Sequence, residues 1–146
     1  MNQYFSSPEN GKLTTLAYEK LEQKEDLKML HVVVYPKCST CRSAVTWLEE
    51  NKIAFKQRHI VDDKLSANEI NDIYTKSGLP IKKFFNTNGV KYRELGLKDK
   101  ISNMTNEACY ELLATDGMLV KRPLVYNEDG AVTVGFKVDE YEKTWK

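Results

Sequence analysis

The sequence predicts an α/β fold in which a mixed β-sheet is flanked by helices. Three observations predict it. First, a β-branched apolar run ending at Val34 is followed by a turn and by apolar residues at helical spacing. Second, another strand-like segment follows that helix at about 53–60. Third, two short apolar runs near the C-terminus flank Asn127–Gly130, which is typical of a hairpin turn, and a last helical pattern follows them.

The order of the elements narrows this fold class. Predicted strands lie at about 30–35, 53–60, 123–126 and 131–135, and predicted helices at about 39–51, 66–77, 81–85, 105–116 and 138–145, with a short helical or irregular link at 92–96. Ser66 and Glu69 form a capping box that begins one helix, and Gly78 ends it. A β-α-β unit followed by a hairpin and a helix is typical of the thioredoxin-like (glutaredoxin-like) plan. The stretch 66–116 would be an inserted helical subdomain.

The length suits one folded domain, because 146 residues match a typical domain size. We expect residues 29–146 to form that domain. The segment 1–28 is polar at its start and has only a weak apolar stripe between Leu13 and Leu27. We therefore expect an N-terminal extension that is disordered or loosely packed rather than a docked helix.

Composition argues against several classes of partner. The formal net charge is only +1, whereas a direct nucleic-acid binder usually has a strong basic excess. No apolar run approaches the roughly 20 residues of a membrane span, and the N-terminus lacks the apolar segment of a signal peptide. Three cysteines without a spaced framework are typical of a reducing compartment. We expect a cytoplasmic protein with neither a nucleic-acid nor a membrane partner.

A C-x-x-C motif lies where the first predicted strand passes into the first predicted helix. Free backbone N–H groups and the helix dipole at this position favour negative charge, so a thiol there should have a lowered pKa. Lys37 and Arg42 flank the motif and should act in the same direction. Cys38, at the exposed helix start, is the expected nucleophile. Cys41, one turn inside, is expected to resolve a mixed disulfide.

Two other uses of the cysteine pair stay open. A zinc site usually needs four ligands, and the remaining candidates Cys109, His31 and His59 lack ligand spacing, so no metal site is expected. The pair could also be two structural buried thiols. The strand-turn-helix context favours redox chemistry. We expect Cys109 to be an inert buried thiol and His59 a packed histidine.

The dipeptide Arg122-Pro123 is the second candidate feature. In a thioredoxin-like fold the segment entering the third strand lies across from the C-x-x-C motif, and X-Pro is where cis peptide bonds occur. Arg122 could present a fork of donors to an oxyanion or a carboxylate. The alternative is a surface arginine before an edge-strand proline.

Several stretches together carry a family resemblance: Tyr35–Arg42, Ser77–Pro80, Phe84–Thr87, Tyr92–Leu97, Asp116–Pro123 and Val134–Lys137. On these stretches, residues 29–145 resemble the arsenate reductase/Spx family, whose fold is thioredoxin-like with a helical insert. Residues 1–28 have no counterpart in that pattern.

For the reductases, the resemblance implies that Cys38 attacks arsenate and that glutaredoxin and glutathione complete turnover. It matches Arg122 to an arginine that holds the oxyanion and Pro123 to a cis proline, while Asn86 and Phe136 stand near the places of two further arginines. The expected substrate is a small oxyanion or a disulfide. No bound cofactor is expected, and the electron donor would be glutathione, glutaredoxin or thioredoxin. The residues expected around the substrate are Lys37, Ser39, Thr40, Arg42 and Pro123.

The second cysteine of the motif, Cys41, matches the Spx-type regulators rather than the reductases. There the resemblance implies a C-x-x-C that closes on oxidation and binding to the RNA polymerase α subunit. Gly78 matches a glycine of that contact, and Arg122 matches an arginine in their R-R-P stretch. We therefore expect a thiol-dependent oxidoreductase resembling arsenate reductase that cycles a Cys38–Cys41 disulfide, with a redox-sensing transcriptional regulator as the alternative.

Overall fold

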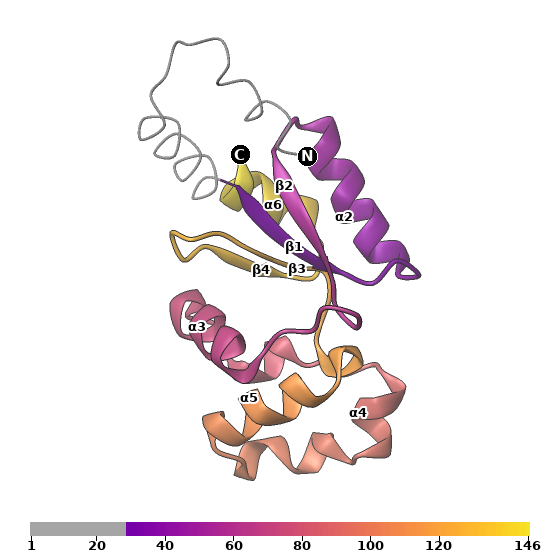
Figure 1. Ribbon diagram of the computed structural model, residues 1–146, viewed down its shortest axis with the longest axis vertical. Coiled ribbons are helices and arrows are strands. Elements are labelled where there is room, and N and C mark those ends of the chain that lie inside the picture. The colour runs from indigo at the N-terminus through magenta and orange to yellow at the C-terminus, as the bar shows by residue number, and fades with distance from the viewer. Residues whose placement is uncertain (1–28) are drawn as a thin grey trace, which may run out of the picture.

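A computed structural model describes residues 29–146, so the expected extension at 1–28 lies outside the described residues. The described chain has a sheet with its helices at one end and a cluster of helices at the other (Figure 1). This arrangement follows from the chain order, because all the helices of the cluster are inserted between the second and third strands.

The sheet has four strands in the order β2-β1-β3-β4. Their bounds are Leu30–Val34 for β1, Phe55–His59 for β2, Leu124–Tyr126 for β3 and Val132–Val134 for β4. β1 pairs with β2 in parallel, while β3 is antiparallel to both β1 and β4. Val33 pairs with Leu124, so the start of β3 lies beside the end of β1. The predicted mixed sheet and thioredoxin-like plan are confirmed.

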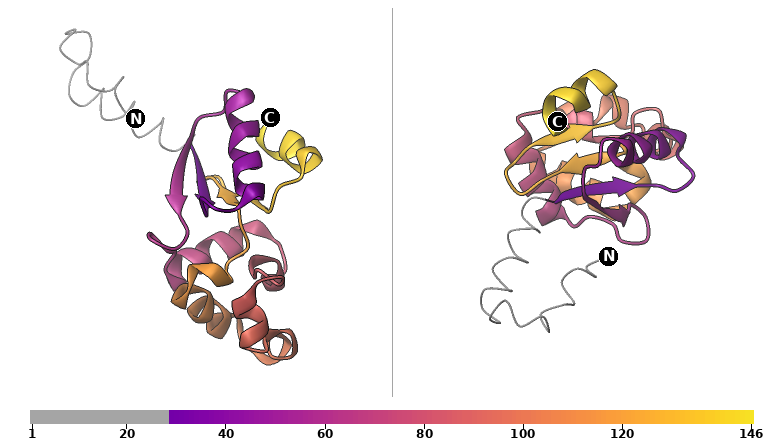
Figure 2. Two further views of the ribbon diagram at one scale, coloured as in Figure 1. Left: turned by 90° about the vertical axis from the view of Figure 1, so that its right-hand side faces the viewer. Right: turned by 90° about the horizontal axis from the view of Figure 1, so that it is seen from above.

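Alternation along β1 assigns its side chains to two cores. Leu30, Val32 and Val34 pack with residues of α2 (Ser39–Glu50) and α6 (Val138–Trp145) on one face. Val33 packs with the insert on the other face. This is the period-two pattern of a strand that is buried on both sides. Figure 2 shows α2 and α6 on the same side of the sheet.

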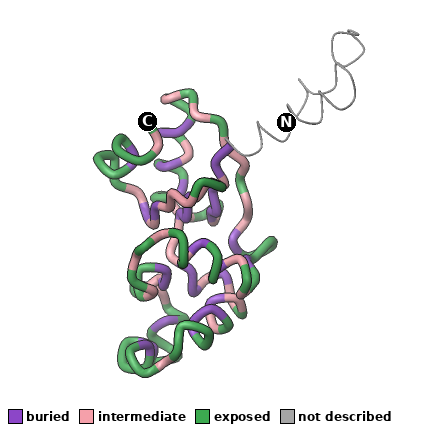
Figure 3. Tube along the Cα trace, turned by 90° about the vertical axis from the view of Figure 1, so that its left-hand side faces the viewer, coloured by how far each residue is buried: buried purple, intermediate pink, exposed green. Residues whose placement is uncertain are grey.

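The insert is built from short helices around an apolar centre. It contains α3 (Ala67–Ser77), η3 (Ile81–Phe84), α4 (Val90–Glu94), η4 (Leu97–Asp99), η5 (Ile101–Asn103), α5 (Asn106–Thr115) and η6 (Gly117–Leu119). α3 packs against α5, and buried positions occur in both the sheet and the insert (Figure 3). The predicted caps of α3 are confirmed: Ser66 and Glu69 form a capping box, and Gly78 ends the helix in the left-handed conformation.

The second strand is shorter than predicted. The alternation from Ile53 suggested a strand over 53–60, but the Ile53 N–H donates to the Leu48 carbonyl at 3.0 Å. It therefore closes the last turn of α2, after Lys52 has reversed the chain with a positive φ of 59°. A hydrogen bond at a helix end has displaced one that would have extended the strand.

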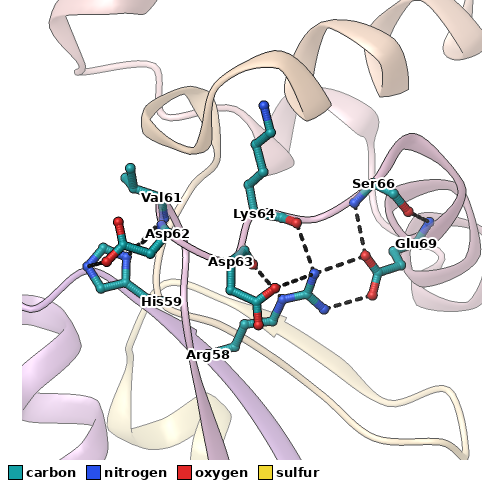
Figure 4. A network of polar contacts seen from close by, with 8 residues as sticks. All are labelled: Arg58, His59, Val61, Asp62, Asp63, Lys64, Ser66 and Glu69. Atoms are coloured by element: carbon teal, nitrogen blue, oxygen red, sulfur yellow. Dashed lines mark hydrogen bonds and ion pairs between the residues drawn. The ribbon is translucent and has the colours of Figure 1, made fainter.

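Arg58 of β2 joins the sheet to the insert (Figure 4). Its guanidinium donates to both carboxylate oxygens of Glu69, at 2.7 and 3.0 Å, and to the carbonyls of Asp63 and Lys64. Glu69 also accepts from the Ser66 N–H at 2.9 Å. The hydrogen bonds from Arg58, opposed by burial and helped by Ser66, lower the pKa of Glu69 to about 2.

Glu69→Gln is expected to destabilise the fold by about 1 kcal/mol at pH 7, because a partly exposed two-pronged ion pair contributes modestly. The pKa of Glu69 is lower in the folded state than its ordinary 4.5. Its contribution is thus complete above pH 4.5 and is lost as the pH falls toward about 2. Urea unfolding of the wild type and of Glu69→Gln at pH 7 and pH 3 measures this contribution. The control is Glu94→Gln, because Glu94 is an exposed glutamate of α4. A stability gap that is equal at both pH values would contradict the ion-pair account.

Candidate functional site

Cys38 is the N-cap of α2, with the extended dihedrals φ −92° and ψ 117°. Its N–H donates to the Tyr35 carbonyl at 2.9 Å, which closes the turn after β1. Its sulfur lies over the first helical turn and accepts from the Cys41 N–H at 3.4 Å. The predicted helix start is confirmed, but the thiol is half-buried rather than exposed, because the sulfur folds back toward the helix.

The pKa of Cys38 is lowered. Burial opposes this shift, but hydrogen bonds from the side chain and the backbone N–H of Cys41, together with the charge of Arg122, outweigh burial. The cation with the largest effect is Arg122, rather than Lys37 or Arg42, which flank the motif in sequence. The expected contribution of those two stays a prediction: Lys37 is exposed, and the Arg42 guanidinium donates to the Pro36 carbonyl at 3.0 Å.

Cys41 has the opposite character. Its side chain is 2% exposed, and burial together with its hydrogen bond to Cys38 raises its pKa to about 12. Both cysteines are free thiols here. The pair is thus arranged as an acidic thiol at the helix start that accepts a hydrogen bond from a buried, protonated thiol one turn inside.

Arg122 lies two residues before β3, whose first residue, Leu124, pairs with Val33 of β1, and its bond to Pro123 is cis. The guanidinium carbon is 5.3 Å from the centre of the Tyr35 ring, and Nη1 donates to the Val120 carbonyl at 3.5 Å. The Nε atom is buried and has no hydrogen-bond partner within residues 29–146. Arg122 is therefore held against the cysteine loop with one buried donor, Nε, left unsatisfied by the described residues.

Tyr35 is a site residue that the sequence did not indicate. The guanidinium of Arg122 stacks over the Tyr35 ring. The Tyr35 and His59 rings pack edge-on, with their centroids 5.9 Å apart. The fold plan placed the Arg122 segment across from the cysteine motif, but the stacking of its guanidinium on Tyr35 depends on the pairing of β1 with β3. His59 is packed as expected, since its Nδ1 accepts from the backbone of Val61 and Asp62.

The remaining predicted site residues lie in three places: the first turn of α2, the segment before β3 and the insert. Ser39 and Thr40 are exposed in the first turn of α2, and Pro123 is buried immediately before β3. Gly78 is exposed at the end of α3, in the insert, with nothing within 4 Å of where a Cβ would stand. It belongs to the insert, whereas the cysteine pair lies at the passage from β1 to α2.

Arg122→Met is expected to raise the pKa of Cys38, because the substitution removes the main cation and keeps an unbranched apolar side chain. Alkylation of Cys38 at pH 7 should slow by on the order of two- to fivefold, as the thiolate fraction falls. Timed iodoacetamide labelling with peptide mass spectrometry measures the rate. Arg42→Met is the matched control, and a larger effect of that control than of Arg122→Met would contradict the assignment.

A known protein family matches the part of the chain that contains these site residues. The model of the ArsC family matches residues 33–144, which include the cysteine loop, the insert and the hairpin. The chain belongs to the ArsC family. The predicted family resemblance is thereby confirmed.

Two curated relatives differ in what is known of them. The uncharacterized protein YusI of Bacillus subtilis is 52% identical over 111 residues, which are 76% of this chain and 93% of YusI. The global transcriptional regulator Spx of Listeria innocua is 27% identical over 115 residues, covering 79% of this chain and 86% of Spx. The curated relatives thus include a transcriptional regulator.

Solved structures of the family agree with the fold. A protein of Bacteroides fragilis described as related to the ArsC family is 50% identical, with a TM-score of 0.76 over 80% of this chain and 98% of its own. A protein of Streptococcus mutans described as a possible arsenate reductase is 39% identical, with a TM-score of 0.72 over 79% and 98% of the two chains.

The two places near which the resemblance implies further arginines hold Asn86 and Phe136 in this chain. Asn86 donates to the Met118 carbonyl at 3.5 Å, and Phe136 packs edge-on against Tyr141 at 4.8 Å. Neither side chain can give a charged, two-pronged contact to an oxyanion. Arg122 is therefore the arginine that remains from the three implied by the resemblance.

Three further features of the described residues bear on function: the metal-ligating residue types, the third thiol, and the length and polarity of the helices. Within residues 29–146 no three His, Cys, Asp or Glu side chains are gathered to hold a metal ion. Cys109 is fully buried in α5, and burial raises its pKa, as expected of an inert thiol. No helix in this range is long and apolar enough to cross a membrane.

Proposed function

We propose that this ArsC-family protein is a thiol-dependent oxidoreductase that cycles a Cys38–Cys41 disulfide. The observation that carries the proposal is the pairing of an acidic thiol at the N-cap of α2 with a protonated thiol one turn inside. A thiolate is the attacking species in exchange, and a nearby second thiol releases what the first has captured.

The reaction would proceed by two exchanges. The Cys38 thiolate attacks one sulfur of a substrate disulfide, forms a mixed disulfide and releases the first substrate thiolate. Cys41 then loses its proton and attacks the Cys38 sulfur, which forms the Cys38–Cys41 disulfide and releases the second thiolate. A thiol donor, either glutathione or a protein of the glutaredoxin or thioredoxin type, reduces the pair again. We place this cycle in the cytoplasm, where such donors keep thiols reduced.

A disulfide is favoured over arsenate as the substrate. Asn86 and Phe136 occupy the two positions where further arginines would hold an oxyanion. Each missing charged hydrogen bond would have contributed ~1.5–3 kcal/mol to binding. A disulfide needs no such clamp, because Cys38 attacks a neutral sulfur and Arg122 has only to stabilise thiolate charge.

Turnover of a small disulfide and of arsenate would test the proposal. Glutathione supplies the electrons, and NADPH consumption through glutathione reductase reports them, with hydroxyethyl disulfide as one substrate and arsenate as the other. We expect turnover of the disulfide well above that of arsenate, unchanged in a Cys109→Ala control. Failure to turn over the disulfide, together with failure of diamide to close a Cys38–Cys41 bond, would overturn the proposal.

A redox-switched regulator is the second candidate. The Spx relatives and the exposed Gly78 on the insert favour it. It predicts binding of the C-terminal domain of the RNA polymerase α subunit, with affinity that depends on whether the cysteine pair is oxidised. A pull-down with the reduced and the oxidised protein tests this, and Gly78→Arg should abolish the contact. No binding in either redox state would remove this candidate.

A further inference from the structure

A basic hollow of about 380 Å³ lies where the insert meets the segment that leads into β3. We call it the lysine hollow; it is lined by Pro80, Lys82, Lys83, Phe85, Thr87 and Lys121. Its two sides are joined through the backbone, because the Lys121 N–H donates to the Phe84 carbonyl at 2.8 Å and Phe85 forms a β-bridge with Val120. The fold therefore fixes the backbone of the hollow, while the side chains of Lys82 and Lys83 are exposed.

The cations of the lysine hollow are not neutralised by the described residues. Within residues 29–146, Lys82, Lys83 and Lys121 form no ion pair. None of the lining residues is acidic, and two of them, Pro80 and the buried Phe85, are apolar. Unpaired cations beside apolar side chains complement a ligand that carries carboxylates together with an apolar group.

The segments that build the cysteine site share this lack of acidic residues. The cysteine loop and α2 lie in 31–48, and the two sides of the lysine hollow lie in 77–93 and 117–127; none of these three ranges contains an Asp or Glu. The whole chain has 21 acidic residues against 22 Lys and Arg. A nearly neutral chain thus places its acidic residues in other segments, so the site and the hollow are built from segments in which Lys and Arg are the only fixed charges.

Lys121 links the lysine hollow to the nucleophile. The chain leaves η6 here and crosses from the insert to β3 (Figure 1). The next residue, Arg122, stacks over Tyr35 at 5.3 Å, and its charge acts on the Cys38 thiol. Consecutive Cα atoms are about 3.8 Å apart, and an extended chain advances about 3.3 Å per residue. A substrate that covers Cys38 and Arg122 therefore reaches the hollow with a few further residues.

We propose that the lysine hollow, together with Arg122, binds an acidic peptide segment of the substrate, so that Cys38 selects peptide disulfides flanked by Asp or Glu. The inference rests on the proposed function, because it names the class of disulfide that enters the same cycle. A flanking segment fits better than a small free anion, since Lys82, Lys83 and Thr87 are exposed and do not enclose a small ligand. A nucleic acid would need a longer row of cations than three lysines around one hollow.

Matched peptides test the inference on the reduced full chain. Each peptide has one cysteine, held as a mixed disulfide with thionitrobenzoate and flanked on both sides by Glu, by Gln or by Lys. The Cys38 thiolate bonds to the peptide sulfur and breaks its bond to thionitrobenzoate, whose released anion is followed by absorbance. We expect the Glu peptide to react at least tenfold faster than the Gln peptide at low salt, and the Lys peptide to be the slowest. The advantage should fall below twofold at ~1 M salt, where charges are screened beyond about 3 Å.

Substitutions separate the lysine hollow from the general charge of the protein. Lys82→Gln combined with Lys83→Gln, and Lys121→Gln alone, should each lower the ratio of the Glu-peptide rate to the Gln-peptide rate at least threefold. Lys98→Gln combined with Lys100→Gln removes charge from exposed positions of the insert that do not line the hollow, and it should leave the ratio unchanged. Charge reversal by Lys82→Glu with Lys83→Glu should make the Lys peptide react faster than the Gln peptide.

The failure of this inference differs from the failure of the proposed function. Equal rates for the Glu and Gln peptides, or a ratio that falls as far in the Lys98 and Lys100 control as in the Lys82 and Lys83 variant, would overturn the inference and leave the cycle intact. A short DNA duplex that inhibits the reaction more strongly than a cysteine-free Glu peptide would also overturn it, in favour of a nucleic-acid partner. If none of the peptides reacted with Cys38, the proposed function itself would fall.

Discussion

Cys38→Ser is expected to lose turnover of a small disulfide by at least about a thousandfold. The site lowers the pKa of the Cys38 thiol, whereas a serine hydroxyl at the same N-cap stays protonated. The hydroxyl can accept the Cys41 N–H as the sulfur does, so the fold should be preserved. The coupled NADPH assay measures the loss, and thermal unfolding checks the fold.

Cys41→Ser provides the matched contrast. It keeps the nucleophile and removes the resolving thiol, so it should perform the first exchange and then accumulate a mixed disulfide on Cys38. Intact-mass spectrometry detects the added group. If Cys38→Ser retained a tenth or more of the turnover, or if Cys41→Ser accumulated no mixed disulfide, the assignment of roles would be wrong.

Gly117→Ala is expected to be the most destabilising substitution among the glycines of the fold. A Cβ on Gly117 would stand 2.0 Å from the carbonyl oxygen of Ile60 and 2.7 Å from its carbon. Both atoms are backbone, so no side chain can turn away. Forcing the segments apart should cost on the order of 3–5 kcal/mol. Urea unfolding at neutral pH measures the change.

Gly78→Ala is the matched control for Gly117→Ala. Gly78 has a φ of 71° but open space around it, so alanine should cost only the left-handed backbone penalty, about 1 kcal/mol. Equal losses for the two variants would contradict the close approach. Gly117 begins η6, which leads toward Arg122. Gly117→Ala should therefore also displace Arg122 and raise the pKa of Cys38 in the protein that remains folded.

Local signals in the sequence predicted most of the fold. Helix starts at Cys38 and Ser66, the stop at Gly78 and the hairpin turn all depend on neighbours a few residues apart. Such signals are readable because capping and turn chemistry are local. The error at Ile53 has the same origin, since alternation alone does not show which backbone group its N–H will bond.

The fold plan predicted that the Arg122 segment lies across from the cysteines, but the individual side-chain contacts between distant segments could not be predicted from the sequence. Arg122 was a candidate for binding an anion, but its place over Tyr35 depends on the pairing of β3 with β1. The same applies to Arg58, which holds Glu69 at the start of the insert. The family resemblance supplied the cis bond at Pro123, which the residues alone left as one alternative.

The central claim is that the helix start and Arg122 lower the pKa of the Cys38 thiol, and one titration tests it most directly. The rate of Cys38 alkylation by iodoacetamide is measured across pH on the reduced full chain, with Cys41→Ala to remove the hydrogen bond from the buried thiol. The account predicts a midpoint clearly below the value of a free thiol, about 8.5, and a higher midpoint in the variant. A midpoint at or above that of a free thiol, unchanged in Cys41→Ala, would contradict it.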